Sequence, residues 1–313
     1  MKSAIVILGP TASGKTQISI ELSKEIGSEI ISADSMQVYK FMDIGTAKPT
    51  DDEKCGIPHF LIDEVNPDED FSVAMYKDLA TGYMEDINKR GKIPVIAGGT
   101  GLYINSLIYN ISFTETNVDA QLREKLTEQA LLNGNKFLHD KLRAVDPISA
   151  ERIHENNVKR VVRALEVYYQ TGKPISQHQE VSRLVPSSFR FIKIGLDMDR
   201  QRLYQRIDQR VDIMLEKGLV HEVKGLVEKG FDLGSKAFEG LGYKQILSYL
   251  NGDISLDEAV YIIKRDTRHY AKRQMTWFRK IEDVYWINLH EVSDLNEIIK
   301  KIKNYIAYHG IIL

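Results

Sequence analysis

A glycine-rich octapeptide near the amino terminus, GPTASGKT at 9–16, constrains the fold more than any other feature of the sequence. It fits the pattern G-x-x-x-x-G-K-[ST] and lies between an apolar, β-branched run at 3–8 and a segment where helical spacing resumes at Gln17. A strand, a loop and a helix in this order form a P-loop, in which backbone N–H groups and the amino end of the helix face an anion. The residues expected to hold phosphates are Gly9, Pro10, Thr11, Ala12, Ser13, Gly14, Lys15 and Thr16.

Two side chains of this loop suit a phosphate ligand. The ammonium group of Lys15 would neutralise phosphate oxygens, and the hydroxyl group of Thr16 could bind Mg²⁺, the expected cofactor. The motif therefore indicates a nucleotide-binding or ATP-binding protein, or one that binds another ligand with two or more phosphates. It does not identify the reaction, and ATPases, kinases and other transferases stay open at this point.

Short apolar strands alternate with helical segments in the first third of the chain. After the P-loop strand, the runs 30–32 and 93–97 are the next candidates for buried strands, and the turn GGTG at 98–101 follows the second of them. Such alternation favours an α/β fold with a parallel sheet flanked by helices, which binds its ligand at the carboxyl ends of the strands. We expect a P-loop NTPase-like core of this kind.

The middle of the chain has a different pattern. Strand signals vanish between 117 and 185, where helical periodicity predominates, and an alternating strand pattern resumes at 189–196. Beyond that strand the sequence is mostly helical, apart from a short strand at 284–288. We therefore predict a catalytic core made of residues 1–116 and 186–313, with an inserted all-helical domain at 117–185.

Composition narrows the class of protein. Hydrophobic residues make up 43% of the chain and charged residues 27%, which is ordinary for a soluble globular protein. No apolar run approaches the length of about 18 residues needed to cross a bilayer, so we expect neither a secreted nor a membrane-bound protein. A single cysteine, Cys55, excludes an intramolecular disulfide and a cysteine-based zinc site, and it favours a reducing, cytoplasmic location.

Charge is distributed unevenly along the chain. The formal net charge is −2, but residues 1–70 hold 13 acidic and 6 basic residues, whereas residues 141–210 hold 14 basic and 8 acidic residues. The basic stretch could face the phosphates of a nucleic acid. An uneven but merely solvated surface is the alternative that charge alone leaves open.

An aspartate follows the second predicted strand. Asp34 would therefore lie at the same edge of the sheet as the phosphate site. Its carboxylate could bind Mg²⁺ or act as a general base, or it could cap the next helix. The residue alone does not decide between these roles.

Ten motifs that span nearly the whole chain resemble, in order, those of the tRNA dimethylallyltransferase family. They are GPTASGKT (9–16), DSMQVYK (34–40), DIGTAKP (43–49), PHFLID (58–63), AGGTGLYI (97–104), RVVRALEVY (160–168), TGKPIS (171–176), RIDQRVDIMLEKGLVHEV (206–223), GLGYKQ (240–245) and TRHYAKRQMTWFRK (267–280). Eukaryotic members of that family add a zinc-finger tail that contains cysteine and histidine. Because no cysteine follows Cys55, the resemblance is to the bacterial type.

The resemblance implies a prenyl transfer. The P-loop would hold dimethylallyl diphosphate, and the acceptor would be N6 of the adenosine 3′ of the anticodon in tRNA. Asp34 would accept the proton of the amine, and Thr100 would hold the base or the donor across the site. Lys15 and either Arg206 or Arg210 would meet the leaving diphosphate, although a salt bridge to a nearby aspartate suits either arginine equally well.

Several positions are expected to contact tRNA. Lys159 and Arg163 lie four residues apart on one predicted helix face, while Val162, Leu165 and Val167 face inward. A solvated helix face is the alternative. By resemblance, the RNA-contacting set in the first two thirds of the chain is Asp34, Ser35, Met36, Gln37, Thr100, Arg123, Lys159, Arg160, Val161, Val162 and Arg163.

A second basic segment lies near the end of the chain. Residues 264–280 include seven basic residues and the single acid Asp266, together with aromatic residues that could stack on bases. We expect Trp277 and Phe278 to pack on the core instead. The phosphate contacts predicted here are Arg268, Lys272 and Arg273.

Three other functions compete with tRNA prenylation. An isopentenyltransferase that acts on free AMP, ADP or ATP would share the P-loop and the aspartate, but it would need neither the helical insertion nor the basic carboxyl-terminal region. A small-molecule kinase would bind ATP in the P-loop, and the order of the motifs disfavours it. A non-catalytic P-loop RNA-binding module would leave Asp34 and Thr16 without a purpose. We expect a monomer that binds the tRNA anticodon stem-loop.

Overall fold

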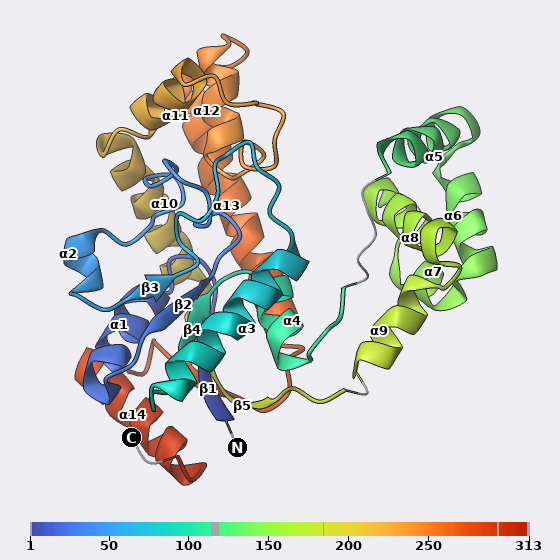
Figure 1. Ribbon diagram of the computed structural model, residues 1–313. Helices are drawn as coiled ribbons and strands as arrows, with labels where there is room; N and C mark the ends of the chain where they lie inside the picture. The colour runs from blue at the N-terminus through green and yellow to red at the C-terminus, as the bar shows by residue number, and fades with distance from the viewer. Residues whose placement is uncertain (1, 114–118, 184, 293, 312–313) are drawn as a thin grey trace. The chain divides into compact units, whose positions relative to one another are not determined.

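The computed structural model describes residues 2–113, 119–183, 185–292 and 294–311. These residues form two compact units, one made of Met1–Ile104 with Ser188–Leu313 and the other of Asn105–Ser187 (Figure 1). The expected boundary between 116 and 117 falls among residues 114–118, outside the described part of the chain. The helical unit instead includes residues from Asn105 onward.

A six-stranded parallel sheet organises the larger unit. Its strand order is β3-β2-β4-β1-β5-β6, which places the P-loop strand β1 between β4 and β5. This confirms the predicted α/β fold with a parallel sheet. The strands are β1 (Lys2–Leu8), β2 (Ile30–Ala33), β3 (His59–Phe60), β4 (Val95–Gly98), β5 (Phe189–Asp197) and β6 (Val284–Asn288).

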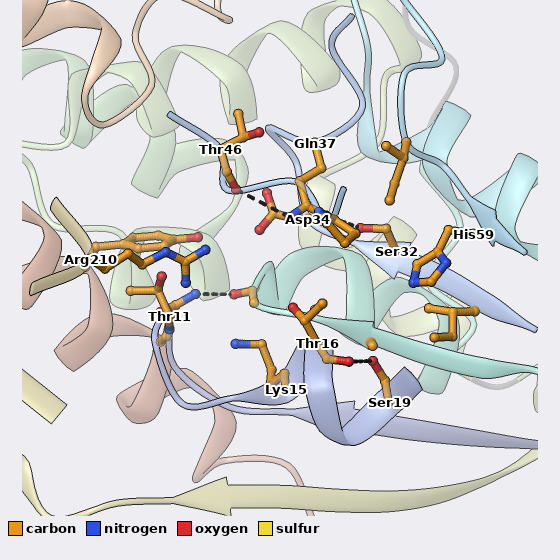
Figure 2. A pocket seen from close by; sticks show the side chains of 18 residues that line it. Thr11, Lys15, Thr16, Ser19, Ser32, Asp34, Gln37, Thr46, His59 and Arg210 are labelled. Atoms are coloured by element: carbon orange, nitrogen blue, oxygen red, sulfur yellow. Dashed lines mark hydrogen bonds between the residues drawn. The ribbon is translucent and has the colours of Figure 1, made fainter. Parts of the chain in front are cut away.

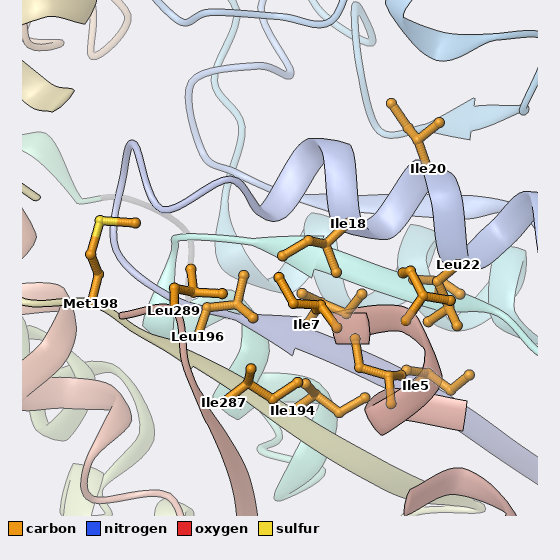
Figure 3. Packing of buried hydrophobic residues seen from close by; sticks show 14 of the residues in the cluster. Ile5, Ile7, Ile18, Ile20, Leu22, Ile194, Leu196, Met198, Ile287 and Leu289 are labelled. Atoms are coloured by element: carbon orange, nitrogen blue, oxygen red, sulfur yellow. The ribbon is translucent and has the colours of Figure 1, made fainter. Parts of the chain in front are cut away.

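Apolar side chains explain why these strands lie inside. Residues Ala4 to Leu8 of β1 are at most 1% exposed, and burial of an isoleucine or leucine side chain stabilises a fold by about 1.5 to 3 kcal/mol. Figure 3 shows Ile5 and Ile7 of β1 packed with Ile194 of β5 and Ile287 of β6. The run Ala4 to Leu8 of β1 is therefore continuously apolar, as expected for a central strand of a parallel sheet that is covered on both faces.

Helices of the larger unit follow the strands and cover the sheet. Helix α1 (Lys15–Ile26) contacts β1, β4 and α14 (Leu295–Tyr308), and α3 (Val73–Lys89) contacts β1 and β2. Helix α10 begins at Arg200, because the Asp199 side chain accepts the N–H groups of Gln201 and Arg202 in its first turn. The other helices are α2 (Asp51–Lys54), α10 (Arg200–Glu216), α11 (Leu219–Glu228), α12 (Tyr243–Leu250) and α13 (Leu256–Phe278). Helix α4 (Gly101–Ile108) begins in the larger unit and ends in the smaller one.

Five helices build the smaller unit around an apolar core of its own. Leu138, Leu142, Val161 and Leu165 are fully buried in it. The helices are α5 (Ala120–Asn133), α6 (Asn135–Val145), α7 (Pro147–Arg152), α8 (Val158–Thr171) and α9 (Ile175–Arg183). Across the described residues of both units, no helix combines the length and the apolar character that a membrane span requires.

Candidate functional site

The P-loop turns between β1 and α1 and lines one pocket of the larger unit. Gly14 has φ 93°, a backbone conformation that favours glycine, and α1 starts at the next residue. Thr11, Lys15 and Thr16 line the pocket. The amino end of a twelve-residue helix therefore faces the space into which these side chains project.

The Asp34 turn forms a second wall of the pocket. One carboxylate oxygen of Asp34 accepts the N–H group of Met36 at 2.9 Å, so the residue closes a turn and does not cap a helix. The backbone N–H of Ser35 donates to the Thr100 hydroxyl at 2.9 Å, and the N–H of Thr100 donates to the Ala33 carbonyl at the same distance. Thr100 therefore ties the loop after β4 to the Asp34 turn.

Close backbone approach makes the loop after β4 sensitive to side-chain size. A Cβ atom built on Gly98 would lie 2.2 Å from the carbonyl oxygen of Ala33, a distance that real contacts do not allow. Gly98 pairs with Ala33 in the sheet. This glycine lets the Asp34 turn and the Thr100 loop lie side by side.

Gln274 of α13 joins this loop to the P-loop. Its side-chain oxygen accepts the N–H of Thr11 at 2.9 Å, and its side-chain nitrogen donates to the Gly99 carbonyl at 2.9 Å. Gln274 is 5% exposed; its bond to Gly99 is buried, and its bond to Thr11 is partly buried. Because buried polar groups are costly to leave unpaired, Gln274 fixes the separation of the two loops.

Positive charge in the pocket lies in an unfavourable environment. Burial, and then the charge of Arg210, lower the pKa of Lys15 to about 7, against the smaller raising effect of the Asp34 carboxylate. The Lys15 ammonium donates to the Pro10 carbonyl at 2.7 Å. Burial also lowers the pKa of Arg210, while the Asp34 carboxylate raises it. Such sites gain stability from a multiply charged anion.

Tyr270 of α13 stands beside Asp34 in the same pocket. Burial, and then the negative charge of Asp34, raise the pKa of Tyr270 to about 12, and its oxygen lies within hydrogen-bonding reach of Thr100 and Gln274. At neutral pH the phenol is therefore protonated and can act as a donor.

The remaining predicted residues of the core lie around this pocket. A Cβ atom on Gly14 would lie 3.8 Å from a guanidinium nitrogen of Arg206, so this arginine borders the P-loop. The amide nitrogen of Gln37 donates to the carbonyls of Thr46 and Ala47 at 3.3 and 3.4 Å, which holds the following loop over the site. Met36 packs against residue Gly240.

The pocket has two chemically different ends. Figure 2 shows Arg210 and Thr11 at one end and His59 at the other, with Lys15 and Asp34 between them. Cations and backbone donors lie at the first end, and the apolar side chains Ile30 and Ile62 line the pocket as well. The full lining is Thr11, Lys15, Thr16, Ser19, Ile30, Ser32, Asp34, Gln37, Thr46, Pro49, His59, Ile62, Ala97, Gly98, Gly99, Arg210, Tyr270 and Gln274.

The pocket fits the expected Mg²⁺ cofactor. The Thr16 hydroxyl and the Asp34 carboxylate both line it and offer oxygen ligands. Within the described residues, no group of three or more His, Cys, Asp or Glu side chains could hold a metal. Mg²⁺ in phosphate sites takes one or two protein oxygens, with phosphate oxygens and waters as the other ligands, so this small donor set suits it.

Two arginines of the helical unit share one buried carboxylate. Arg123 donates to both oxygens of Glu166 at 2.8 and 2.9 Å, and Arg163 donates to the same carboxylate at 2.5 Å. Glu166 is fully buried, whereas the arginines are 39% and 38% exposed. Although burial raises the pKa of Glu166, the bonds from Arg123 and Arg163 lower it below its usual range. Both arginines therefore have a structural role in addition to any contact with RNA.

The α8 helix separates its predicted RNA contacts into two groups. Lys159 and Arg160 are exposed. Val161 and Val162 are 0% and 5% exposed and belong to the apolar core of the unit, so the prediction that they contact tRNA is wrong for their side chains. They face inward because the helical period places them with Leu165 on the buried side.

The basic residues of α13 also differ in their surroundings. Arg268 forms an ion pair with Asp208 at 2.5 Å, whereas Lys272 and Arg273 are exposed. The Arg273 guanidinium lies 5.8 Å from the ring centre of Tyr270. Of the three predicted phosphate contacts on α13, the exposed Lys272 and Arg273 are therefore better suited to a phosphate backbone than the ion-paired Arg268.

Among the pocket residues that sequence reasoning missed are Tyr270, Gln274 and His59. Tyr270 and Gln274 lie within the motif at 267–280, which was interpreted only as an RNA-binding and packing segment. Their four-residue spacing on one helix face was the available signal. His59 follows Pro58 in the 58–63 motif, but a two-residue strand has no detectable period.

Comparison with known proteins identifies the family. Residues 37–281 match the family model described as IPP transferase. A tRNA dimethylallyltransferase of Acetivibrio thermocellus is 62% identical over 313 residues, which is 100% of each chain. One from Alkaliphilus oremlandii is 52% identical over 301 residues, which is 96% of each chain.

Solved structures agree with these relatives. The tRNA isopentenylpyrophosphate transferase of Bacillus halodurans is 43% identical and has a TM-score of 0.74, covering 98% of this chain and 96% of its own. A eukaryotic dimethylallyltransferase acting on tRNA is 32% identical with a TM-score of 0.79, covering 92% of this chain and 74% of its own. With a family model that matches most of the chain and relatives that match its full length, this chain belongs to the IPP transferase family.

Proposed function

We propose that this chain transfers the dimethylallyl group of dimethylallyl diphosphate to N6 of the adenosine 3′ of the anticodon in tRNA and releases diphosphate. The observation that carries the proposal is one pocket in which Asp34 lies between a cationic, P-loop end and an uncharged end at His59. The relatives described above are named for this transfer to tRNA.

The P-loop end of the pocket would stabilise the leaving diphosphate. Backbone N–H groups at the start of α1, the Lys15 ammonium and the Arg210 guanidinium would receive its developing charge, with Arg206 at the border. Lys15 would regain its proton on binding, because an anion favours the ammonium form. Thr16 would hold Mg²⁺, which would supply further charge neutralisation to the phosphate oxygens when bound.

Asp34 would accept the proton from N6. One of its oxygens is occupied by the Met36 N–H, which leaves the other to receive the proton as N6 bonds to C1 of the prenyl group. The C1–O bond breaks at the same carbon, and its electron pair leaves with diphosphate. Thr100 would hold the Asp34 turn in place through the Ser35 bond, and Tyr270 would border the same space.

The acceptor adenosine would have to leave its base stack to reach this pocket. N6 of a stacked base cannot approach a carbon atom inside a protein, so the base is flipped outward. Among the predicted RNA contacts, Lys159, Arg160, Lys272 and Arg273 have exposed side chains that could bind backbone phosphates of the anticodon stem-loop. We further expect a monomer that acts in the cytoplasm, where its tRNA substrate is found.

A transfer assay with two acceptors tests the proposal. The purified chain is incubated with Mg²⁺, radiolabelled dimethylallyl diphosphate and either an unmodified anticodon stem-loop or AMP. We expect label in the RNA alone. The matched variant Asp34→Asn keeps an oxygen acceptor for the Met36 N–H but cannot take the proton, so turnover should fall by roughly 10²- to 10⁴-fold while the donor still binds.

The other outcomes are equally informative. Label in AMP would assign the chain to the isopentenyltransferases that act on free nucleotides. No transfer to either acceptor would favour the alternative of a kinase that binds ATP in the P-loop. Full activity of Asp34→Asn would remove Asp34 as the proton acceptor but leave the reaction in place.

A further inference from the structure

His59 places a buried, unpartnered nitrogen in the wall of the pocket. Its Nε2 atom is buried and has no hydrogen-bond partner among the described residues, and the side chain lines the end of the pocket away from Arg210. Polar atoms in such positions usually have a partner, so this one calls for a ligand group or a bound water.

The protonation state of His59 follows from its other nitrogen. Nδ1 lies 2.8 Å from the carbonyl oxygen of Ile57, which can only accept, so Nδ1 carries the hydrogen. Burial lowers the pKa of His59, and the imidazole is neutral at physiological pH. Nε2 is then a lone-pair acceptor.

Two neighbouring hydroxyl groups already donate their hydrogen atoms to protein acceptors, so they can only accept from a ligand. The Ser32 hydroxyl donates to the Gln37 side-chain oxygen at 3.0 Å, and the Ser19 hydroxyl donates to the Thr16 carbonyl at 2.8 Å. Both side chains line the pocket and are at most 4% exposed. This end of the pocket therefore offers acceptors, which suit a ligand group that has a hydrogen to donate and disfavour a phosphate.

The sheet explains why these groups gather at one place. Side chains alternate along a strand, so Ile30, Ser32 and Asp34 follow one face of β2 toward its carboxyl end. His59 is the register partner of Ile30 on β3, and Ala97 is the partner of Ser32 on β4. All of them line the pocket, whose walls here are apolar apart from the acceptors.

From this arrangement we infer that the pocket also accepts a prenyl donor that carries a hydroxyl group on one of its terminal methyl carbons, and that His59 is the residue that recognises this hydroxyl. The inference rests on the proposed function, because the prenyl tail lies toward His59 only if the diphosphate occupies the Lys15 and Arg210 end. The hydroxyl would donate to Nε2 and lie between Ile30 and Ile62.

The chemistry of transfer is the same for this donor. The N6–C1 bond forms, the C1–O bond to diphosphate breaks with its electron pair on the leaving oxygen, and the N6 proton passes to the Asp34 carboxylate. The hydroxyl group remains on the transferred chain, so no oxidant is required. The product would be an adenosine that bears a hydroxylated five-carbon prenyl group.

A competition experiment with two matched variants tests the inference. The full chain is given an anticodon stem-loop and equal concentrations of dimethylallyl diphosphate and its terminally hydroxylated analogue, and the two products are quantified by mass spectrometry of the nucleosides. Their ratio gives the ratio of kcat/KM values directly. His59→Asn keeps a donor for the Ile57 carbonyl but has no atom at the Nε2 position, whereas His59→Gln can place an acceptor there.

We expect the wild-type chain to form both products, with the hydroxylated one within about tenfold of the other, because a site with an unpaired acceptor favours the substrate that fills it. His59→Asn should lower the hydroxylated-to-dimethylallyl ratio at least tenfold, and His59→Gln should lower it less. An unchanged ratio in His59→Asn, or dimethylallyl product alone from the wild-type chain, would overturn the inference, with Nε2 then left to bind water. Absence of both products would instead count against the proposed function.

Discussion

Positive charge is held in opposite ways in the two units of this molecule. In the pocket of the larger unit, Lys15 donates to a backbone carbonyl, and burial lowers its pKa to about 7. In the helical unit, Arg123 and Arg163 are paired with the buried carboxylate of Glu166. The first environment gains from an incoming anion, whereas the second is already neutralised. Basic residues that look equivalent in a sequence can therefore serve ligand binding in one place and folding in another.

The largest effect is expected from removing both arginines of the helical unit. The double variant Arg123→Ala with Arg163→Ala would leave Glu166 buried without a cation, which should destabilise this unit by about 3 kcal/mol. Hydrogen exchange of residues 119–183 in the full chain measures this loss, and the strands of the larger unit serve as an internal reference.

Adding Glu166→Gln to that double variant separates folding from RNA binding. Glutamine removes the buried charge and keeps an acceptor for the N–H of Asp119, so protection should return in large part. If affinity for the anticodon stem-loop returns with it, the arginines act through the fold. If affinity stays low in a stable triple variant, they contact RNA and the contrast between the two units is weaker than described.

A smaller effect should follow from Gln274→Met, which tests whether the pocket depends on the two hydrogen bonds of Gln274 to Thr11 and Gly99. Methionine matches the length of glutamine but leaves the Thr11 N–H and the Gly99 carbonyl unpaired, at a cost of about 2 kcal/mol. We expect kcat/KM for transfer to fall roughly thirtyfold, because the P-loop and the Asp34 side of the site lose their fixed separation. Gln274→Glu is the matched control, since it keeps the acceptor for Thr11 only; activity of Gln274→Met equal to wild type would exclude a positioning role.

A more modest effect is expected of pH on the affinity for the prenyl donor. Lys15 loses its proton as pH rises through about 7 in the free site, whereas a bound diphosphate favours the ammonium form. Binding therefore takes up a proton, and the affinity for an unreactive thiolodiphosphate analogue should fall on the order of tenfold between about pH 7 and 8.5. In the variant Lys15→Arg the side chain stays charged over this range, so the affinity measured by calorimetric titration should be nearly independent of pH. The same fall in affinity with pH in this variant would show that another group titrates.

The smallest effect is expected on the exposed face of α8. Lys159→Ala and Arg160→Ala should each weaken stem-loop binding about threefold and reduce its salt dependence by about one phosphate contact. Lys136→Ala removes an exposed cation of the same unit outside the predicted stripe and should change neither quantity. If all three variants lost the same affinity for the stem-loop, the effect would come from the overall charge of the unit and not from specific contacts by Lys159 and Arg160.

Local patterns explain which features could be predicted from the sequence. The P-loop, β1 and the α/β class could be predicted because a strand, a glycine-rich loop and a helix are adjacent in the chain and each carries its own period. Strand β3 has two residues and shows no period. The bridge from Gln274 to Thr11 joins residues 263 positions apart, so it depends on tertiary packing that no local window contains.

Charge patterns were the less reliable guide. The RNA contacts on α8 were predicted from spacing and from the family resemblance, yet Arg163 is paired with the buried Glu166, and the helical period turns Val161 and Val162 inward. Similarly, Arg268 was expected on RNA phosphates, whereas Asp208 lies within ion-pair distance of it. Partners of this kind come from other elements, which is why a count of basic residues overestimates the surface available to a nucleic acid.

The strand order has a consequence for how enzymes of this kind can diverge. Because β4 lies between β1 and β2, the strands that lead into the P-loop and into Asp34 are two strand spacings apart, about 10 Å, and main-chain hydrogen bonds of the sheet set this interval. Substitutions in the surrounding loops can change which molecules enter the pocket without altering this spacing of the strands. A few side-chain changes can then give specificity for a new acceptor or for a prenyl donor with an added group. A different distance between the two strand ends would require a different strand order.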